Sequence, residues 1–241
     1  MAKSSKSKQK SGRKAQSSRS NMNVWIIGAG ILFVALIVLT VALTNRNSAP
    51  PAVTQPDVPS EWAARNTLGN PEAVVTVEAW EDFLCPACGQ WSTNIKPQLY
   101  EKYIKNGDVK LEFHHFPLQI HAPGAQLGAQ AAECAADQDA FWPYHDQLFS
   151  AASNRGQAGF QIQSLAGYAK TLELDESDFL QCMNSQRHRA TIDESVNRAI
   201  SQGLNSTPSI LINGQLQESP FDLPLLEAEI DRLLAAASSG S

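Results

Sequence analysis

Two cysteines separated by two residues, Cys85 and Cys88, constrain the fold more than any other feature of this chain. They follow the β-branched run 73–80 (AVVTVEAW), which predicts a buried strand, and Pro86 suits the first turn of a helix over 86–104. A thiol at a helix N-terminus lies near unpaired N–H groups and the positive end of the helix dipole, which favour the thiolate. The segment therefore predicts a redox pair, with Cys85 as the nucleophile and Cys88, one turn deeper, resolving the mixed disulfide.

Two other interpretations of the cysteine pair are weaker. A zinc site needs a second ligand pair at short spacing, and His114, His115 and His121 do not stand at such a spacing from another cysteine. We expect His114 and His115 to be surface or sheet-edge residues. A purely structural disulfide fits this spacing poorly, whereas Pro86 at a helix start is typical of a redox site. No metal and no organic cofactor is expected.

The rest of the body predicts an α/β fold. Further strands are expected over 109–116 and 209–212, and helices over 122–137, 141–151, 162–172, 175–185, 191–203 and 223–237. Asn213-Gly214 is a hairpin signal directly after the last strand. Strands at both ends with helices between them indicate a sheet interrupted by a helical insertion. The aromatic residues Phe141, Trp142, Phe149 and Phe160 are expected to form the core of that insertion.

Three segments of the body resemble a known family. DFLCPACG, the downstream STPSILING and the intervening FWPYHDQLF are similar to segments of the DsbA-type thiol–disulfide oxidoreductases of the thioredoxin superfamily. The resemblance implies a thioredoxin-like domain over 61–237 with a helical insertion over about 118–200. It also implies that the Thr207-Pro208 bond is cis and faces the redox pair, offering a backbone edge to an extended substrate. By the same resemblance, the dipeptide Pro86-Ala87 tunes the redox potential.

This chain departs from the family pattern at two positions. The best-known oxidant of the family has His where this chain has Ala87, so we expect a less acidic nucleophile and a milder oxidant. Many members carry an acid six residues before the first cysteine, and here that residue is Ala79. Glu78 stands one residue earlier, on the opposite face of a strand. Unless a bulge corrects the register, another group such as Glu81 or water is expected to accept the proton of the second cysteine.

Cys134 and Cys182 fall in separate helices of the predicted insertion. Outside the cytoplasm we expect them to form a structural disulfide. Two buried thiols and a second redox centre that shuttles electrons are the alternatives.

The N-terminal part predicts a membrane anchor. Residues 24–43 form an uncharged apolar run of the length needed to cross a bilayer as one helix. The basic tail over 1–23 carries seven Lys and Arg, which predicts a cytoplasmic N-terminus. A cleaved signal peptide is the alternative, but the run is long for one and has a poor cleavage site. The Pro-rich segment 44–60 is expected to be an extended linker.

Charge and topology together limit the function. The body over 47–241 carries all 24 acidic residues against 11 basic ones, so no nucleic acid partner is expected. The sequence predicts a single-pass protein of the cytoplasmic membrane whose extracytoplasmic domain introduces disulfides into exported proteins. The resemblance implies a quinone-linked membrane oxidase as redox partner. A disulfide reductase or isomerase, or a non-catalytic tethered chaperone or binding module on a thioredoxin scaffold, are the alternatives.

Overall fold

The computed structural model describes Gly30, Phe33 and residues 56–239. The chain divides into two units, Met1–Ala52 and Val53–Ser241, and the fold below is that of the second. The predicted tail over 1–23, the predicted membrane helix over 24–43 except for two residues, and most of the predicted linker over 44–60 lie outside the described residues. In the described part of the chain, no helix is both long and apolar enough to span a bilayer.

A five-stranded mixed sheet forms one half of the domain, with the order β1-β3-β2-β4-β5. The strands are β1 (Thr67–Leu68), β2 (Val75–Glu81), β3 (Val109–His115), β4 (Ser209–Ile212) and β5 (Gln215–Leu216). The central pair, β2 and β3, is parallel, and the other neighbours are antiparallel. The hairpin between β4 and β5 turns at Asn213 and Gly214, whose φ angles of 45° and 77° are those that Asn-Gly adopts most readily.

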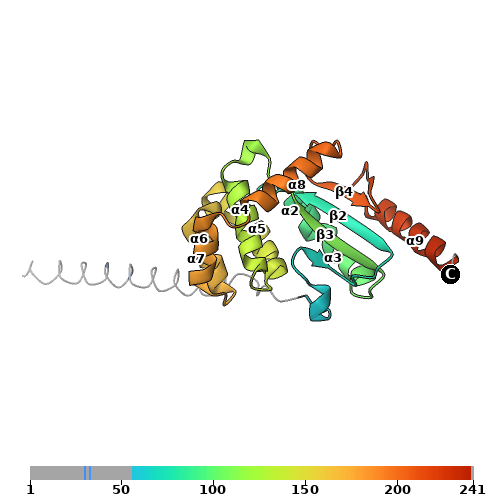
Figure 1. The fold of residues 1–241 in the computed structure, drawn as a ribbon, viewed down its shortest axis with the longest axis horizontal. Helices are drawn as coiled ribbons and strands as arrows, with labels where there is room; N and C mark the ends of the chain where they lie inside the picture. The colour runs from blue at the N-terminus through green and yellow to red at the C-terminus, as the bar shows by residue number, and fades with distance from the viewer. Residues whose placement is uncertain (1–29, 31–32, 34–55, 240–241) are drawn as a thin grey trace, which may run out of the picture. The chain divides into compact units, whose positions relative to one another are not determined.

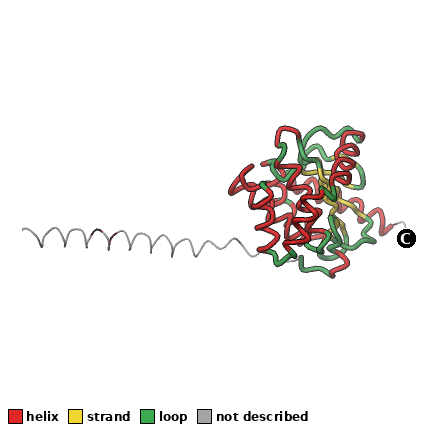
Figure 2. The backbone as a smooth tube through the Cα atoms, turned by 60° about the vertical axis from the view of Figure 1, so that its left-hand side comes forward, coloured by secondary structure: helices red, strands yellow, loops and turns green. Residues whose placement is uncertain are grey.

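Helices form the other half and flank the sheet. They are α2 (Pro86–Asn94), α3 (Lys96–Leu99), α4 (Gly124–Ala136), α5 (Phe141–Arg155), α6 (Ile162–Thr171), α7 (Glu176–Ser185), α8 (Arg189–Ser201) and α9 (Leu223–Ser239). The block from α4 to α8 connects β3 to β4, and α4 to α7 gather on one side of the sheet (Figure 1). From a second direction, most of the helices again lie to one side of the strands (Figure 2).

The prediction of a single helix over 86–104 is wrong in one respect, because the structure has three shorter helices there. α2 ends at Asn94, α3 follows, and Tyr100–Ile104 is a π-helix. Pro97 lies in the first turn of α3 and has no N–H to donate to the preceding turn, so the regular helix cannot continue through it.

One aromatic core joins the sheet to the helical block. The Phe83 ring packs 5.0 Å from that of Phe149 in α5, and the Phe113 ring of β3 packs 5.4 Å from that of Phe141. His145, only 1% exposed, lies among these rings, 5.2 Å from Phe113. The predicted core of the insertion is therefore buried as expected, but it is not separate, because it is continuous with the core beneath the sheet.

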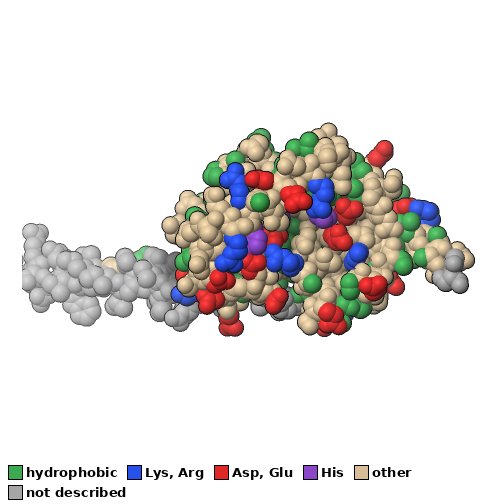
Figure 3. All heavy atoms as spheres, viewed as in Figure 1, with side chains coloured by type: hydrophobic (Ala, Val, Ile, Leu, Met, Phe, Trp, Pro, Cys, Tyr) green, Lys and Arg blue, Asp and Glu red, His purple; other side chains and the backbone are tan. Residues whose placement is uncertain are grey.

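The expectation that His114 and His115 are surface or edge residues is wrong, since both are buried. The Nε2 of His115 lies 2.9 Å from the carboxylate of Glu133 in α4. The ring of His114 stacks at 4.3 Å on Trp80, and its Nδ1 lies 3.2 Å from Arg198 in α8. These partners are far away in sequence, and each supplies a hydrogen-bond partner for one nitrogen of the ring, while the other nitrogen of each ring is buried without one. On the face drawn in Figure 3, acidic and basic side chains are mixed, with histidine between them.

Candidate active site

The turn between β2 and α2 holds both cysteines of the predicted redox pair. Cys85 is the N-cap residue of α2, and its N–H donates to the carbonyl of Asp82 at 3.0 Å, which closes the turn. Cys88 lies in the first turn of α2 and is completely buried, whereas Cys85 is half-buried. Both thiols are free. One sulfur is thus open to a reaction partner while the other lies beneath it.

Hydrogen bonds to the Cys85 sulfur lower the pKa of its thiol to about 5. The Cys88 thiol is the largest cause, and the backbone N–H groups of Ala87 and Cys88 act in the same direction, against the effect of partial burial. Ala87 contributes through its amide at the start of the helix, as the N-terminal position predicts. Pro86, the other residue between the cysteines, is exposed.

Burial raises the pKa of Cys88, and the charges of Cys85 and Glu81 add to the effect. Glu81 is the last residue of β2 and is 1% exposed, and neither of its carboxyl oxygens has a hydrogen-bond partner. Burial also raises the pKa of this carboxyl, which the nearby charge of Lys96 partly offsets. Cys88 and Glu81 therefore form a buried pair of groups that both favour the protonated state.

The direction of the Glu81 side chain follows from strand alternation. β2 pairs with β3 without a bulge, so Glu78 and Ala79 point to opposite faces of the sheet. Glu78 is half-buried near His114, with 3.7 Å between Oε2 and Nε2. Glu81 stands two residues after Ala79 and shares its face, which is the face that covers Cys88. Of the options that the sequence left open, the structure excludes a bulge and brings Glu81 to the redox pair.

Sequence reasoning missed Asp82, whose side chain is completely buried at the centre of the turn. Its carboxylate accepts hydrogen bonds from the N–H of Leu84 at 2.7 Å and of Leu118 at 2.9 Å, and pairs with Nδ1 of His121 at 2.7 Å. Its own N–H points to the Cys88 sulfur at 3.5 Å. Asp82 thus ties the cysteine turn to the loop that follows β3. Its position in DFLCPACG, three residues before the first cysteine, was the only available signal.

The second predicted element of the site, Thr207-Pro208, lies against Cys85. The peptide bond between these residues is cis, as is Ala122-Pro123. The pairing of β4 with β2 sets Ser209 opposite Trp80, which carries the preceding loop to the cysteine turn. The Cys85 thiol donates to the carbonyl oxygen of Thr207 at 3.4 Å. The backbone of this loop therefore borders the reactive sulfur.

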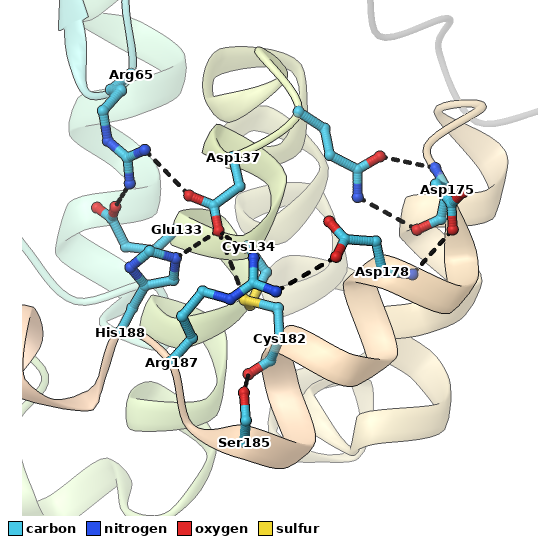
Figure 4. Close-up of a disulfide and its surroundings, with 11 residues drawn as sticks. Arg65, Glu133, Cys134, Asp137, Asp175, Asp178, Cys182, Ser185, Arg187 and His188 are labelled. Carbon is cyan, nitrogen blue, oxygen red and sulfur yellow. Dashed lines mark hydrogen bonds and ion pairs between the residues drawn. A yellow bond between two sulfur atoms is a disulfide. The ribbon is translucent and has the colours of Figure 1, made fainter.

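Cys134 in α4 and Cys182 in α7 are joined by a disulfide (Figure 4). Beside it, the Asp137 carboxylate binds Arg65 at 3.1 Å, and Arg187 and His188 at 2.8 Å each. These side chains converge on Asp137 from different segments, as Figure 4 shows. Asp137, the Cys182 sulfur and His188 have a spacing that could suit a metal. That sulfur is already oxidised, however, and the carboxylate is already neutralised, so the group is an ion-pair cluster around a crosslink.

Comparison with known proteins agrees with this geometry. A family model described as Thioredoxin matches residues 63–232. The "Probable disulfide bond formation protein D" of Bacillus anthracis is 29% identical to this chain, over 72% of the chain and 80% of its own length. The "Na(+)/H(+) antiporter NhaA 3" of Salinispora tropica is 32% identical over 75% of the chain, but the chain spans only about a quarter, 26%, of that protein.

A solved structure shows the same fold. Oxidised BdbD from Bacillus subtilis superposes with a TM-score of 0.66 at 24% identity, covering 71% of this chain and 94% of that one. The chain belongs to the thioredoxin family, and within it to the DsbA-type thiol–disulfide oxidoreductases.

Proposed function

We propose that this protein introduces disulfide bonds into exported polypeptides by exchange at Cys85 and Cys88. The observation that carries the proposal is the asymmetry of the pair. Cys85 is accessible and acidic, whereas Cys88 is buried and holds its proton. A reactive outer thiolate above a protected inner thiol is the arrangement that thiol–disulfide exchange requires.

The stabilised thiolate supports electron flow from the substrate to the protein. A low pKa of Cys85 favours the reduced form of the pair, and a favoured reduced form makes the disulfide a stronger oxidant. This supports oxidation of substrate thiols over reduction of substrate disulfides. The milder potential expected from Ala87 concerns the degree of oxidising strength and not its direction.

Oxidation of a substrate dithiol takes two thiol–disulfide exchanges. A substrate thiolate attacks the Cys85 sulfur of the Cys85–Cys88 disulfide, so that a mixed disulfide forms and Cys88 leaves with the electron pair and takes up a proton. A second substrate thiolate then attacks the substrate sulfur of the mixed disulfide, and Cys85 leaves as a thiolate. The substrate has lost two electrons and two protons, and the protein holds two electrons and one of the protons, the other passing to solvent.

Glu81 is proposed as the group that exchanges this proton with Cys88. Its carboxyl is buried on the same face as Cys88 and has no hydrogen-bond partner, so it favours the neutral, proton-donating form. A neutral acid next to a leaving thiolate supplies the proton without bringing water into the core. Thr207 and Pro208 are proposed as the backbone edge along which the substrate lies, because the Thr207 carbonyl borders the Cys85 sulfur.

The cellular setting is part of the proposal and depends on the N-terminal sequence. The apolar run over 24–43, with seven basic residues before it, supports a single-pass anchor with the catalytic domain on the extracytoplasmic side. The Cys134–Cys182 disulfide fits an oxidising compartment. A quinone-linked membrane oxidase is the proposed acceptor of the electrons, by resemblance to the family.

Oxidative refolding of a reduced, disulfide-containing protein tests the function. The protein is expected to speed disulfide formation, and Cys85→Ser is expected to abolish the activity. Cys88→Ser is expected to abolish it as well, because this variant cannot form the Cys85–Cys88 disulfide that a substrate thiolate attacks. Offered an oxidised substrate instead, the same variant is expected to accumulate a mixed disulfide through its Cys85 thiolate, because no inner thiol is present to release it. A Cys85→Ser variant that retains full activity would instead identify a non-catalytic binding module. A wild-type protein that only reduces disulfides at equilibrium with glutathione would identify a reductase.

A further inference from the structure

We propose that the hollow beside Cys85, between α2 and α5, binds an apolar side chain that neighbours the reactive cysteine of the substrate. The inference rests on the proposed function and deepens it by naming a substrate class. The hollow has a volume of about 390 Å³ and is lined by Leu84, Cys85, Pro86, Gly89, Gln90, Thr93, Phe149, Ala152 and Ser153. That volume accommodates a large side chain.

The lining selects for apolar groups. Apart from Cys85, whose sulfur carries no charge while it is bonded to a substrate cysteine, none of its side chains is ionisable, and Leu84, Phe149 and Ala152 present carbon to the hollow. Thr93 already donates its hydroxyl within the helix, to the carbonyls of Gly89 at 2.8 Å and Gln90 at 3.3 Å. A charged substrate side chain would therefore lose water here without gaining a partner of opposite charge.

The walls of the hollow are fixed before any substrate arrives. Phe149 is buried, and its ring packs 5.0 Å from Phe83 and 4.9 Å from His145. The opposite wall has a gap because residue 89 is glycine. A Cβ built on Gly89 would lie 3.8 Å from the Phe149 ring, which is ordinary contact. One carbon thus fits at residue 89, and a longer side chain there would fill the hollow.

The exchange reaction determines what reaches the hollow. During turnover a substrate cysteine is bonded to the Cys85 sulfur, and that residue forms part of the hollow's wall. On another side the same sulfur lies 3.4 Å from the Thr207 carbonyl, where the substrate backbone is proposed to run. Successive Cα atoms of the substrate are about 3.8 Å apart, so a residue next to its cysteine is within reach. We therefore assign the hollow to that neighbouring residue.

Dithiol peptides that differ at one position provide the test. One series carries Leu or Asp directly before the reactive cysteine, and a second series carries them directly after it. In one of the series the wild-type protein is expected to oxidise the Leu peptide about tenfold faster than the Asp peptide in kcat/KM, from partial burial of the side chain. Gly89→Leu is expected to reduce this ratio to near one by slowing the Leu peptide selectively.

Gly167→Leu is the matched control. Gly167 is an exposed glycine of α6, a Cβ on it meets nothing within 4 Å, and it lies outside the hollow. The same substitution at this position is expected to leave the tenfold ratio intact. A ratio that falls equally in both variants would overturn the assignment, since the loss would then come from placing Leu in a helix at a glycine.

Ser153→Lys keeps the inference testable if Gly89→Leu does not fold. Ser153 is exposed at the rim, so a lysine is tolerated there and brings a positive charge to the hollow. The Asp peptide is expected to be oxidised several-fold faster by this variant, with the Leu peptide little changed. A wild-type protein that oxidises all four peptides at the same rate would overturn the inference and leave the proposed function standing. A wild-type protein that oxidises none of them would overturn the proposed function itself.

Discussion

At the scale of single residues, the acidity of Cys85 comes from hydrogen-bond donors at the start of α2 and from the inner thiol. With a pKa of about 5, the reduced pair binds one proton fewer than two free thiols across the range from that pH to about 8.5. The folded pKa is depressed, so the resulting stabilisation of the reduced fold is complete above the unfolded pKa and is lost as the pH falls through 5.

We therefore expect the reduction potential to change its slope near pH 5. Below that pH two protons accompany two electrons, giving about 59 mV per pH unit, and above it one proton does, giving about 30 mV. Titration against a glutathione or dithiothreitol buffer across this range measures both slopes. Alkylation by iodoacetamide should follow the same pH dependence and label Cys85 before Cys88. A single slope through the whole range would contradict the assigned acidity.

Ala87 offers a direct way to change that acidity. Histidine at this position would add a cation or an N–H donor within reach of the Cys85 sulfur, so Ala87→His is expected to lower the pKa of Cys85 further. A gain of about 1–2 kcal/mol for the thiolate corresponds to a reduction potential higher by about 20–45 mV. The fold should be unaffected, because Ala87 is half-buried on the first turn of α2. A lower pKa without a higher potential would show that thiolate stability does not set the potential.

Glu81 should matter for both stability and turnover. Its folded pKa is raised, so the carboxyl destabilises the fold increasingly as the pH rises above its unfolded pKa. Glu81→Gln keeps the shape without the charge, and we expect it to unfold at higher denaturant concentration at pH 8 but not at pH 4. If the carboxyl transfers a proton to Cys88, the same variant should slow exchange by roughly 100-fold or more. Glu78→Gln on the opposite face is the control, and equal slowing by it would contradict the role of Glu81.

The position of Glu81 shows which features of the site residue patterns can predict and which they cannot. Strand alternation correctly predicted that Glu78 points away from the cysteines. The sequence alone could not decide whether Glu81 or water exchanges a proton with Cys88. That decision depends on where β2 ends and on the burial of its last residue, and both depend on packing against the helices. Asp82 could not be identified at all, because its partners at Leu118 and His121 come from a loop whose path the sequence does not reveal.

At the scale of elements, the disulfide between α4 and α7 is the strongest crosslink of the helical block. It joins residues 48 positions apart, which in the chain-entropy model is worth about 4 kcal/mol. The double variant Cys134→Ala, Cys182→Ala is expected to lose about 2–4 kcal/mol of unfolding free energy in a urea titration. The potential of Cys85 and Cys88 should not change, because the crosslink joins α4 to α7 whereas both reactive cysteines lie at the start of α2. A changed potential or a loss of turnover would favour the alternative of a second redox centre.

Most elements were predicted from sequence because their signals are local. Asn213-Gly214 specified the hairpin turn, and the β-branched run over 73–80 specified β2. The end of α2 before Pro97 could have been predicted from the sequence, since a proline cannot continue the hydrogen bonding of the preceding turn. β1 is only two residues long and forms through pairing with β3, so it carries no periodic signal.

At the scale of the whole molecule, the proposed topology predicts which segments a protease can reach. On intact protoplasts, added protease is expected to cut within 44–60 and release the folded domain, while the basic tail over 1–23 stays protected. After lysis the tail should be digested as well, which serves as the control. A domain that is protected until lysis would contradict the proposed orientation.

The rings of Phe83, Phe113, Phe141 and Phe149 form a wall shared by the sheet and the helical block. Because of this shared wall, the sheet or the helical block of this protein is a poor candidate for replacement by that of a related enzyme. A chimera that took its helices from another member of the family would set foreign side chains against Phe83 and Phe113. Of these two residues, Phe83 lies only two positions before Cys85. Any attempt to transplant the substrate-facing hollow must therefore carry these rings with it as one unit.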